Sequence, residues 1–408
     1  MHILIISESF PPETKSASTL FFELSESLVK KGHAVSVITR LPKYNVADGV
    51  DLGAIPPKEI LSGVKVYRLQ TPPLIRDIPF VRGVEHFLLG LIFFRGGLSL
   101  GEFDVILVYS PPLPLGITGY WLGKMKKCPV VVNIQDLYPQ TVIDLGLLKN
   151  KFLIRVSRMM EKFIYRRADA LTVHSNGNKE YVVSTGADRE RTEVVHNWVD
   201  TNLIKPGEKN NDLARKYGLT GKFVVSFAGV MGFAQGLEVV TQAANLLKDN
   251  KDILFVLVGD GVKKPELESS VRGMRIDNVL FIPTQPVSIY PQVLHASDVC
   301  LVTLRKDMVT PVVPGKMLSI MASAKPLLAS LPLLGDAPKI IEQYGCGLAV
   351  KPSDPRALAD AVLKLYNNSS LRGEMGRKGR EAAVSHFSRS ICVDKYERLF
   401  EAVLARRK

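Results

Sequence analysis

The sequence predicts an α/β protein of two Rossmann-like parallel-sheet domains that face each other across a cleft. Two observations lead to this fold class. Short runs rich in Val, Ile and Leu alternate with longer amphipathic stretches, which is typical of βαβ units. These runs are also too many for one doubly wound sheet, and a polar segment interrupts them near the middle of the chain. The runs are 3–6, 34–38, 64–69, 105–109, 130–134, 170–173, 223–227, 253–258, 279–281, 299–302, 327–329 and 347–350.

The first βαβ unit illustrates the pattern. An apolar strand at 3–6 precedes a loop at 7–16, and leucines every four residues then predict a helix over 17–31. Gly32 is the expected left-handed residue after the helix, and the next strand covers 34–38. Most strands are apolar on both faces, as strands covered by helices on both sides must be.

The polar, Pro- and Gly-containing stretch near the middle of the chain predicts the domain boundary. We expect a first domain over 1–200, a linker over 201–220 and a second domain over 221–385. The last stretch, about 386–408, is a basic amphipathic helix with no strand after it. We expect it to pack back onto the first domain.

Composition narrows the class of partner. The chain has 408 residues, with 53 Lys and Arg against 40 Asp and Glu, a formal net charge of +13. Such an excess suits nucleic acid, an anionic membrane or a polyanionic small molecule. Because no zinc module or RNA-binding signature occurs, we do not expect nucleic acid as a partner.

Four widely spaced cysteines predict neither a disulfide framework nor a metal site. The N-terminus does not resemble a signal peptide, and no apolar stretch is long enough to span a bilayer, so we expect a cytoplasmic protein.

The loop after the first strand opens a helix with the small residues Ser16, Ala17 and Ser18. Backbone amides at a helix start attract anions, so this loop is a candidate phosphate site. The alternative is a helix cap by Ser16 or Ser18 without a ligand. The loop lacks the pattern GxGxxG, which argues against a dinucleotide cofactor.

Asp136 directly follows the apolar strand at 130–134. A carboxylate at the end of a strand can orient a substrate hydroxyl or accept its proton. The alternative is a turn aspartate that caps the short helix before Gly146.

Three further loops lie between a strand and a helix in the second half of the chain. Gly229, Gly232 and Gly236 resemble a phosphate-binding turn, although close packing of helix and strand explains such glycines nearly as well. For the loop with Gly259, we favour a structural role.

The third of these loops ends at Pro314, Gly315 and Lys316 and opens a helix. Its amides and the lysine together suit a diphosphate, whereas the alternative is an exposed surface lysine.

Taken in order, these loops resemble the retaining glycosyltransferases of family 4, which have the GT-B fold. The branch that builds bacterial polysaccharides, including fucosamine-transferase-like O-antigen enzymes, is the most similar. The segments that carry the resemblance are Phe10-Pro-Pro12, Lys31-Gly-His-Ala-Val35, Asp136-Leu-Tyr-Pro139, Val195-His-Asn-Trp-Val-Asp200, Ala228 to Gly236, Val258-Gly-Asp-Gly261, His295-Ala-Ser-Asp298, Pro314-Gly-Lys316 and Met321-Ala-Ser-Ala-Lys-Pro326.

The resemblance implies a nucleotide-sugar donor, UDP-linked in our expectation, that the second domain holds without a cofactor or metal. It also implies an acceptor held by the first domain, with Asp136 near the reacting sugar. The donor-binding residues would be Gly229, Gly232, Gln235, Gly236, Gly259, Pro314, Gly315, Lys316 and Ser319.

The sequence departs from the family pattern at several of these positions. Val230 and Gln235 replace the usual Arg and Lys, Pro311 and Ser319 replace the usual pair of glutamates, and Ser16 and Ala17 stand near the usual pair of glycines. Lys316, with Arg305 and Lys306 as more distant candidates, can supply the missing positive charge.

Two basic and apolar segments of the first domain, 72–100 and 149–167, predict a surface that contacts an anionic membrane. A polyprenyl-diphosphate-linked sugar acceptor would require such a peripheral contact with the inner leaflet of the plasma membrane. The alternative is a pair of ordinary core helices with solvated basic faces. The residues expected at this surface are Arg82, Phe87, Phe94, Arg95, Arg155, Arg158 and Lys162.

The sequence therefore predicts a metal-independent retaining transferase that moves a sugar to a lipid-linked or saccharide acceptor in cell-surface polysaccharide synthesis. A sugar-nucleotide 2-epimerase of the same architecture and a catalytically inactive nucleotide-sugar-binding subunit remain alternatives.

Overall fold

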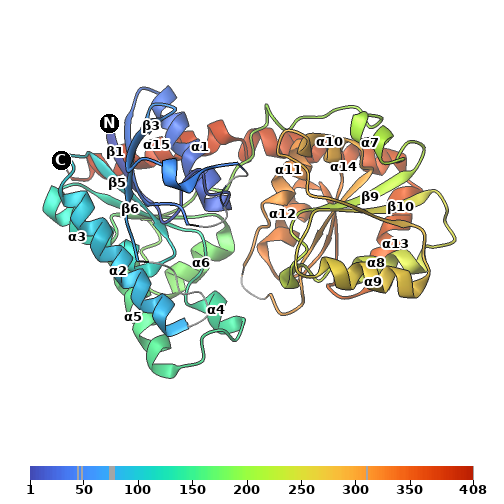
Figure 1. The fold of residues 1–408 in the computed structure, drawn as a ribbon, viewed down its shortest axis with the longest axis horizontal. Helices are drawn as coiled ribbons and strands as arrows, with labels where there is room; N and C mark the ends of the chain where they lie inside the picture. The colour runs from blue at the N-terminus through green and yellow to red at the C-terminus, as the bar shows by residue number, and fades with distance from the viewer. Residues whose placement is uncertain (44–45, 47–48, 73–78, 309–310, 408) are drawn as a thin grey trace. The chain divides into compact units, whose positions relative to one another are not determined.

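The computed structural model describes residues 1–407 apart from 44–45, 47–48, 73–78 and 309–310, and only the backbone of 79–82. The chain divides into two compact units (Figure 1). The first comprises Met1–Asn197 and Arg389–Lys408, and the second comprises Trp198–Ser388.

The first unit contains an eight-stranded sheet in the order β3-β4-β2-β1-β5-β6-β7-β8. Every pairing is parallel except the antiparallel pair β3–β4. The strands are β1 (His2–Ile6), β2 (Ala34–Arg40), β3 (Lys58–Leu61), β4 (Val64–Leu69), β5 (Val105–Ser110), β6 (Val130–Ile134), β7 (Ala170–Val173) and β8 (Thr192–Val194).

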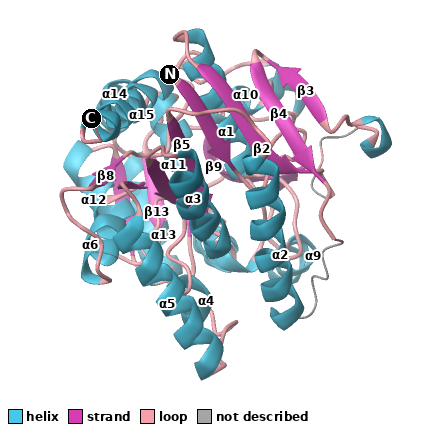
Figure 2. Ribbon diagram, turned by 90° about the vertical axis from the view of Figure 1, so that its left-hand side faces the viewer, coloured by secondary structure: helices cyan, strands magenta, loops and turns pink. Residues whose placement is uncertain are grey.

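Helices cover both faces of this sheet, and the central strands β1, β5 and β6 are almost wholly buried. Helices α2, α3 and α5 lie beside one another in one layer (Figure 2). The helices of the unit are α1 (Ser16–Lys30), α2 (Pro79–Leu98), α3 (Leu113–Lys126), α4 (Gln140–Asp144), α5 (Lys151–Arg167), α6 (Asn176–Ser184) and the C-terminal α15 (Arg389–Ala405), with a short 3-10 turn η1 (Leu52–Ala54).

The second unit contains a six-stranded, all-parallel sheet in the order β11-β10-β9-β12-β13-β14. Its strands are β9 (Phe223–Ala228), β10 (Ile253–Val258), β11 (Val279–Ile282), β12 (Val299–Thr303), β13 (Leu327–Ser330) and β14 (Gly347–Val350). Its helices are α7 (Asp212–Lys216), η2 (Phe233–Gln235), α8 (Glu238–Leu246), α9 (Lys264–Met274), α10 (Tyr290–His295), α11 (Lys316–Ala322), α12 (Asp336–Tyr344), α13 (Pro355–Tyr366) and α14 (Ser369–His386).

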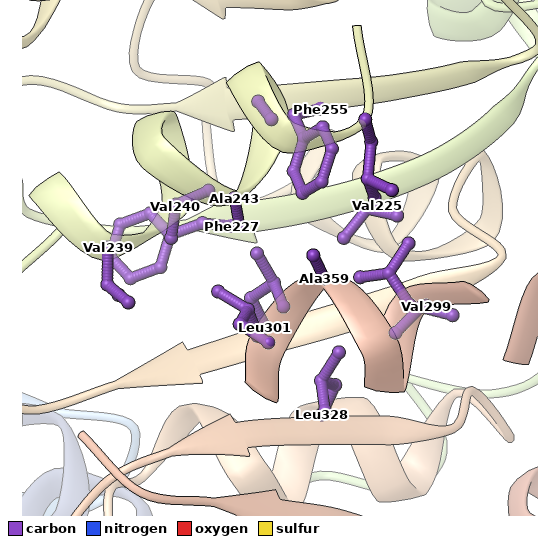
Figure 3. Close-up of a cluster of buried hydrophobic side chains, with 14 of the residues drawn as sticks. Val225, Phe227, Val239, Val240, Ala243, Phe255, Val299, Leu301, Leu328 and Ala359 are labelled. Atoms are coloured by element: carbon purple, nitrogen blue, oxygen red, sulfur yellow. The ribbon is translucent and has the colours of Figure 1, made fainter. Parts of the chain in front are cut away.

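The main core of the second unit lies between the sheet and helices α8 and α13. Phe227 and Val225 of β9 meet Leu301 of β12 and Ala359 of α13 in this cluster (Figure 3). Because apolar side chains of β9 are buried on both faces of the sheet, β9 is a fixed central element. The loop that leaves β9 therefore starts from a rigid position.

The predicted α/β class with two Rossmann-like parallel sheets is confirmed. All twelve apolar runs lie in or overlap strands, and the expected helix over 17–31 is observed as α1, one residue earlier. Two strands, β3 and β8, were not predicted from the sequence. The β3 strand begins with the charged pair Lys58–Glu59 and runs into a tight turn at Ser62–Gly63, and β8 has only three residues, so neither shows a continuous apolar run.

Residues 201–220, expected to form a linker, belong instead to the second unit. The Arg380 guanidinium donates to the carbonyl oxygens of Thr201 at 3.1 Å and Ile204 at 2.9 Å. Further along, Leu213 and Leu219 are buried against β9 and β10. Because this stretch is mainly polar, its few anchoring contacts could not be predicted from the sequence.

The C-terminal helix α15 packs on α1 in the first unit. Glu397 receives hydrogen bonds from Lys31 and pairs with His33, both at 2.7 Å. In the interior, the amide nitrogen of Asn133 donates to the hydroxyls of Tyr396 at 2.8 Å and Thr172 at 2.9 Å. The last helix thus contributes a polar contact to the centre of the first sheet. The residue that it contacts there, Asn133, precedes Asp136 by three positions in the sequence.

All four cysteines are buried and free. Over the parts of the chain that the structure describes, no helix combines the length and the apolar character needed to cross a membrane.

We expect Tyr396→Phe to lower the free energy of unfolding by about 1–2 kcal/mol, because the buried Asn133 amide loses a hydrogen-bond acceptor. Urea denaturation measures the change. Tyr120→Phe is the matched control, since the structure gives the Tyr120 hydroxyl no hydrogen bond to any described residue. Equal stability of the two variants would contradict the role of Tyr396.

Candidate functional site

The strand order of the second unit locates a binding edge. The chain runs outward from β9 to β10 and β11 on one side, and then returns to β12, β13 and β14 on the other. The connections therefore leave β9 and β12 in opposite directions, so the strand order reverses between these two strands. In open parallel sheets, ligands bind beyond the carboxyl ends of the strands at such a reversal. The loops that follow β9 and β12 are the ones placed there.

The turns after β9 and β10 contact each other through their backbones. Gly259 has φ +138°, and a Cβ on it would lie 2.1 Å from the carbonyl oxygen of Gly229. Gly261 has φ +149° and approaches the carbonyl oxygen of Met231 in the same way. These glycines are required because the two turns leave no space for a side chain. Gly259 therefore has a structural role in the contact between the two turns.

The rest of the β9 loop is held in a defined shape. The Gln235 side-chain oxygen accepts from the amide of Gly232 at 3.2 Å, and Gly236 adopts a left-handed φ of +58°. The amide of Arg305, just after β12, donates to the carbonyl of Ala234 at 3.0 Å. The loops after β9 and β12 are thus tied together. Val230 in this loop is 68% exposed.

Lys316 begins α11 and reaches back to the end of β9. Its Nζ lies 3.8 Å from the centre of the Phe227 ring, and a Cβ on Gly229 would come within 2.8 Å of it. Burial without a compensating charge lowers the pKa of Lys316 to about 8. No carboxylate among the described residues forms an ion pair with it. The structure therefore holds a desolvated cation beside the glycine loop at the switch point of the sheet.

Around Lys316, no side chain caps the start of α11. The Leu318 amide donates to the carbonyl of Gly315 at 3.2 Å, and the amides of Gly315 and Lys316 have no described acceptor. Pro314 and Gly315 form the turn into the helix, and the carbonyl of Pro314 accepts from the Met317 amide at 2.9 Å. Ser319 is hydrogen-bonded to the hydroxyl of Tyr290. The Ser319 side chain therefore makes a structural contact with Tyr290. Pro311 lies in the loop between β12 and α11.

Of the more distant cations, Arg305 forms an ion pair with Asp307 at 2.7 Å. Lys306 lies on a mainly apolar pocket of about 460 Å³ formed by the loops after β12 and β13. Of these three cations, Lys316 is the one whose charged group lies beside Gly229.

Asp136 follows β6 in the first unit. Its side chain is accessible, yet desolvation by the surrounding protein raises the pKa of its carboxyl above the ordinary value. No described donor is hydrogen-bonded to this carboxylate, so the predicted capping role is not observed. The neighbouring Gln135 forms two reciprocal amide hydrogen bonds with Asn197, at 3.0 and 3.1 Å, and so fixes the backbone beside Asp136.

Ser16, Ala17 and Ser18 form the first turn of α1, after β1. Neither serine caps the helix, since its N-cap is Lys15, and Ser18 is fully buried with an unsatisfied hydroxyl. The predicted serine cap is therefore wrong. This turn lies next to the strand-order reversal of the first sheet, where β1 has β2 on one side and β5 on the other.

A buried charge cluster beside this turn was not found from the sequence. Arg40, 3% exposed, lies 3.2 Å from Glu8 and 3.4 Å from Glu13. Lys15 lies within 3.7 Å of both carboxylates, and burial raises the pKa of Glu13. Arg68 joins the same region by donating to the carbonyl of Pro11 at 2.6 Å. A basic residue that ends an apolar strand, as Arg40 does, is the signal that could have revealed it.

The residues expected at a membrane-facing surface divide into three groups. Phe87, Arg95, Arg155 and Lys162 are exposed. The side chain of Arg82 lies outside the described part of the structure. The assignment of the remaining two to the surface is corrected: Phe94 packs partly buried against the core, and Arg158 turns toward Glu161, Gln140 and Tyr181.

Across the described ranges, no group of three or more His, Cys, Asp or Glu side chains is arranged to hold a metal ion.

Comparison with known proteins identifies the class. Residues 17–198 match the family model described as a glycosyl transferase 4-like domain, and residues 222–368 match the one described as glycosyl transferases group 1. Together with the two parallel sheets, these matches define a glycosyltransferase of the GT-B fold.

The chain belongs to the group 1 glycosyltransferases. It is 28% identical over 315 residues to "Probable glycosyltransferase WbjE" of Pseudomonas aeruginosa, covering 75% of this chain and 76% of that protein. It is 23% identical over 372 residues to "Putative colanic acid biosynthesis glycosyl transferase WcaI" of Escherichia coli, covering 89% of this chain and 91% of that protein. A GDP-mannose-dependent alpha-mannosyltransferase of Mycobacterium tuberculosis is 24% identical over 66% of each chain.

Solved structures show the same fold. Sucrose-phosphate synthase of Thermosynechococcus elongatus superposes with a TM-score of 0.78 at 18% identity, over 99% of each chain. Anabaena HepE in complex with UDP superposes with a TM-score of 0.75 at 17% identity, over 98% of this chain and 100% of HepE.

We expect Gly259→Ala to destabilise the protein by about 3 kcal/mol or more, because a Cβ would enter the backbone of Gly229 at an unfavourable φ. Gly273→Ala in α9 is the control, since nothing lies within 4 Å of its added Cβ and alanine favours the helix. Thermal and urea unfolding compare the two variants. A tolerated Gly259→Ala would show that the turns do not need this close approach.

Proposed function

We propose that this protein transfers a sugar, with retention of configuration, from a UDP-linked donor to a lipid-linked or saccharide acceptor in cell-surface polysaccharide synthesis. The observation that carries the proposal is the position of Lys316 against the glycine loop at the switch point of the second sheet. We also propose that the reaction needs no metal ion and takes place on the cytoplasmic face of the membrane.

Lys316 suits the diphosphate of such a donor. The leaving group gains negative charge as the bond to the sugar breaks, and a cation already desolvated at that point stabilises it with little reorganisation. The uncapped amides of α11 add hydrogen-bond donors. In this proposal, Lys316 replaces the positive charges that the family has at the positions of Val230 and Gln235.

Asp136 suits the acceptor. Its carboxylate is accessible and free of described donors, so it can accept a hydrogen bond from an acceptor hydroxyl. A pKa above the usual aspartate value also brings its basicity closer to that required for proton transfer. The Gln135–Asn197 pair would keep the loop in position during this step.

The choice of UDP is supported by the structural neighbours. HepE, which shares this fold, has been solved with UDP and with UDP-glucose. The mannosyltransferase relative is named as dependent on GDP-mannose. A thermal-shift comparison of UDP with GDP therefore tests the base directly, and a larger shift with GDP would overturn this part of the proposal.

We expect donor affinity to depend on pH through Lys316. Because its pKa is lowered to about 8, the free protein loses this charge as the pH rises above 8. The Kd for UDP-glucose should therefore stay nearly constant up to about pH 7, roughly double by pH 8 and rise about tenfold by pH 9. Lys316→Met should weaken binding roughly 10- to 100-fold and abolish this pH dependence.

Lys316→Arg should keep the charge and remove the rise in Kd. Lys339→Met, at an exposed position, is the matched control. Titration calorimetry in the presence of EDTA also tests metal independence. Unchanged binding by Lys316→Met, or a requirement for a divalent cation, would contradict the corresponding part of the proposal.

We expect Asp136→Asn to reduce transfer about 100-fold or more while donor binding is retained. In the wild-type protein, activity should fall on the acid side as the carboxylate protonates, at a pH above that expected for an ordinary aspartate. Asp144→Asn in α4 serves as the control.

Product analysis with short-chain polyprenyl-diphosphate sugars measures this transfer. Full activity of Asp136→Asn would exclude the role. Conversion of the donor to an epimer without acceptor would identify an epimerase instead, and no turnover of any donor would identify a binding subunit.

A further inference from the structure

Helices α2, α3 and α5 form one continuous layer on the first unit (Figure 2). The Thr118 hydroxyl of α3 donates to the carbonyl of Gly90 in α2 at 2.8 Å. Gly97 lies against Leu122, and Gly116 lies against Ile164 of α5, in each case without space for a Cβ. The close approach of these helices places their outer side chains on a common surface.

This surface exposes large apolar side chains at helical spacing. On α2, Phe87 and Leu91 lie four residues apart, and on α5, Phe152 and Met159 lie seven residues apart. These spacings of about one and two helical turns place each pair on one face of its helix. Six side chains define what we call the α2–α3–α5 surface. They are Phe87 (49% exposed), Leu91 (62%), Trp121 (52%), Met125 (62%), Phe152 (72%) and Met159 (65%).

The exposed charges on these helices are all positive. Arg95 of α2, Lys124 of α3, and Arg155 and Lys162 of α5 are exposed, and the structure gives none of them an ion pair with a described carboxylate. The two acidic residues of the helices, Glu85 and Glu161, are 8% and 0% exposed. The surface therefore combines apolar groups with unneutralised positive charge.

We propose that the α2–α3–α5 surface binds the headgroup and outer acyl region of an anionic lipid bilayer. Charge complementarity favours this occupant, because phospholipid headgroups neutralise the cations while the apolar side chains enter the hydrocarbon boundary. Trp121 has an apolar body with one polar N–H group, a combination enriched at membrane interfaces. The proposal rests on the lipid-linked acceptor of the proposed function and adds the surface that reaches it.

The corrected set of residues differs from that expected from the sequence. Trp121 and Met125 come from α3, which lies between the two segments recognised as basic and apolar. Phe94 and Arg158 are left out because both are half-buried: Phe94 packs against the core, and Arg158 pairs with Glu161. Only the packing of α3 between α2 and α5 brings the two separate segments into one surface.

Co-sedimentation with phosphatidylglycerol–phosphatidylcholine vesicles tests the proposal on the full chain. We expect binding at low salt that weakens at high salt, and little binding to phosphatidylcholine alone. The double variant Arg155→Gln/Lys162→Gln should bind about 25-fold more weakly, at roughly 5-fold per charge. Its control is Lys248→Gln/Arg272→Gln on the second unit, which should bind like the wild type.

Lipids brominated on the acyl chain should quench tryptophan fluorescence, and Trp121→Phe should remove most of that quenching. The apolar variant Phe87→Ser/Phe152→Ser should lose vesicle binding, whereas Leu246→Ser/Val287→Ser should not. Equal binding to neutral and anionic vesicles, or quenching that persists in Trp121→Phe, would overturn the proposal. A dimer that the apolar variant alone disrupts would assign the surface to a second copy of the chain instead.

UDP-glucose binding separates this proposal from the proposed function. Surface variants that lose vesicles should bind UDP-glucose as the wild type does. Vesicle binding without transfer to any lipid-linked acceptor would refute the proposed function and leave the lipid-binding surface standing. Transfer to such an acceptor without vesicle binding would refute the surface alone.

Discussion

The turns that follow β9 and β10 touch through their backbones, and the candidate donor site depends on that contact. Gly259 and Gly261 allow the two turns to approach, and the β9 loop then takes one fixed shape beside β12. Lys316 can lie over Phe227 only because Gly229 has no side chain in its path. A buried cation is unfavourable unless an anion compensates it, so the same geometry that positions the lysine also favours a diphosphate there.

The net positive charge of the chain has more than one structural role. Lys316 is a single half-buried charge without a described carboxylate partner. Arg40 and Lys15 are instead balanced by Glu8 and Glu13 at the carboxyl edge of the first sheet, where they brace the loop after β1. On the α2–α3–α5 surface, the acids are buried and the bases are exposed. The role of each positive charge therefore depends on whether a carboxylate lies beside it, and composition alone does not show this.

The sequence allowed the fold class to be predicted because parallel strands covered on both sides need continuous apolar runs. It missed β3 and β8, which are stabilised by a hairpin and by one neighbouring strand instead of an apolar run. Lys316 and Asp136 could also be selected from the sequence as candidate site residues. Asp136 directly follows an apolar strand, and Lys316 begins a helix after a Pro-Gly turn. The Glu8–Glu13–Arg40 cluster and the contact between Asn133 and Tyr396 were missed, because each joins side chains from separate parts of the chain and periodicity does not report such pairs.

The sequence by itself determined the two sheets, the helix-to-strand alternation and the loops at which chemistry is expected, because these follow from local periodicity and turn residues. Only the tertiary structure decided that 201–220 belong to the second unit, that Ser319 is hydrogen-bonded to Tyr290, and that Arg158 pairs with Glu161 while Phe94 packs against the core. It also decided that α3 joins two separate basic segments into one surface. The physical reason is the same throughout. Burial and pairing depend on neighbours from distant parts of the chain, and periodicity reports only which side of an element is apolar.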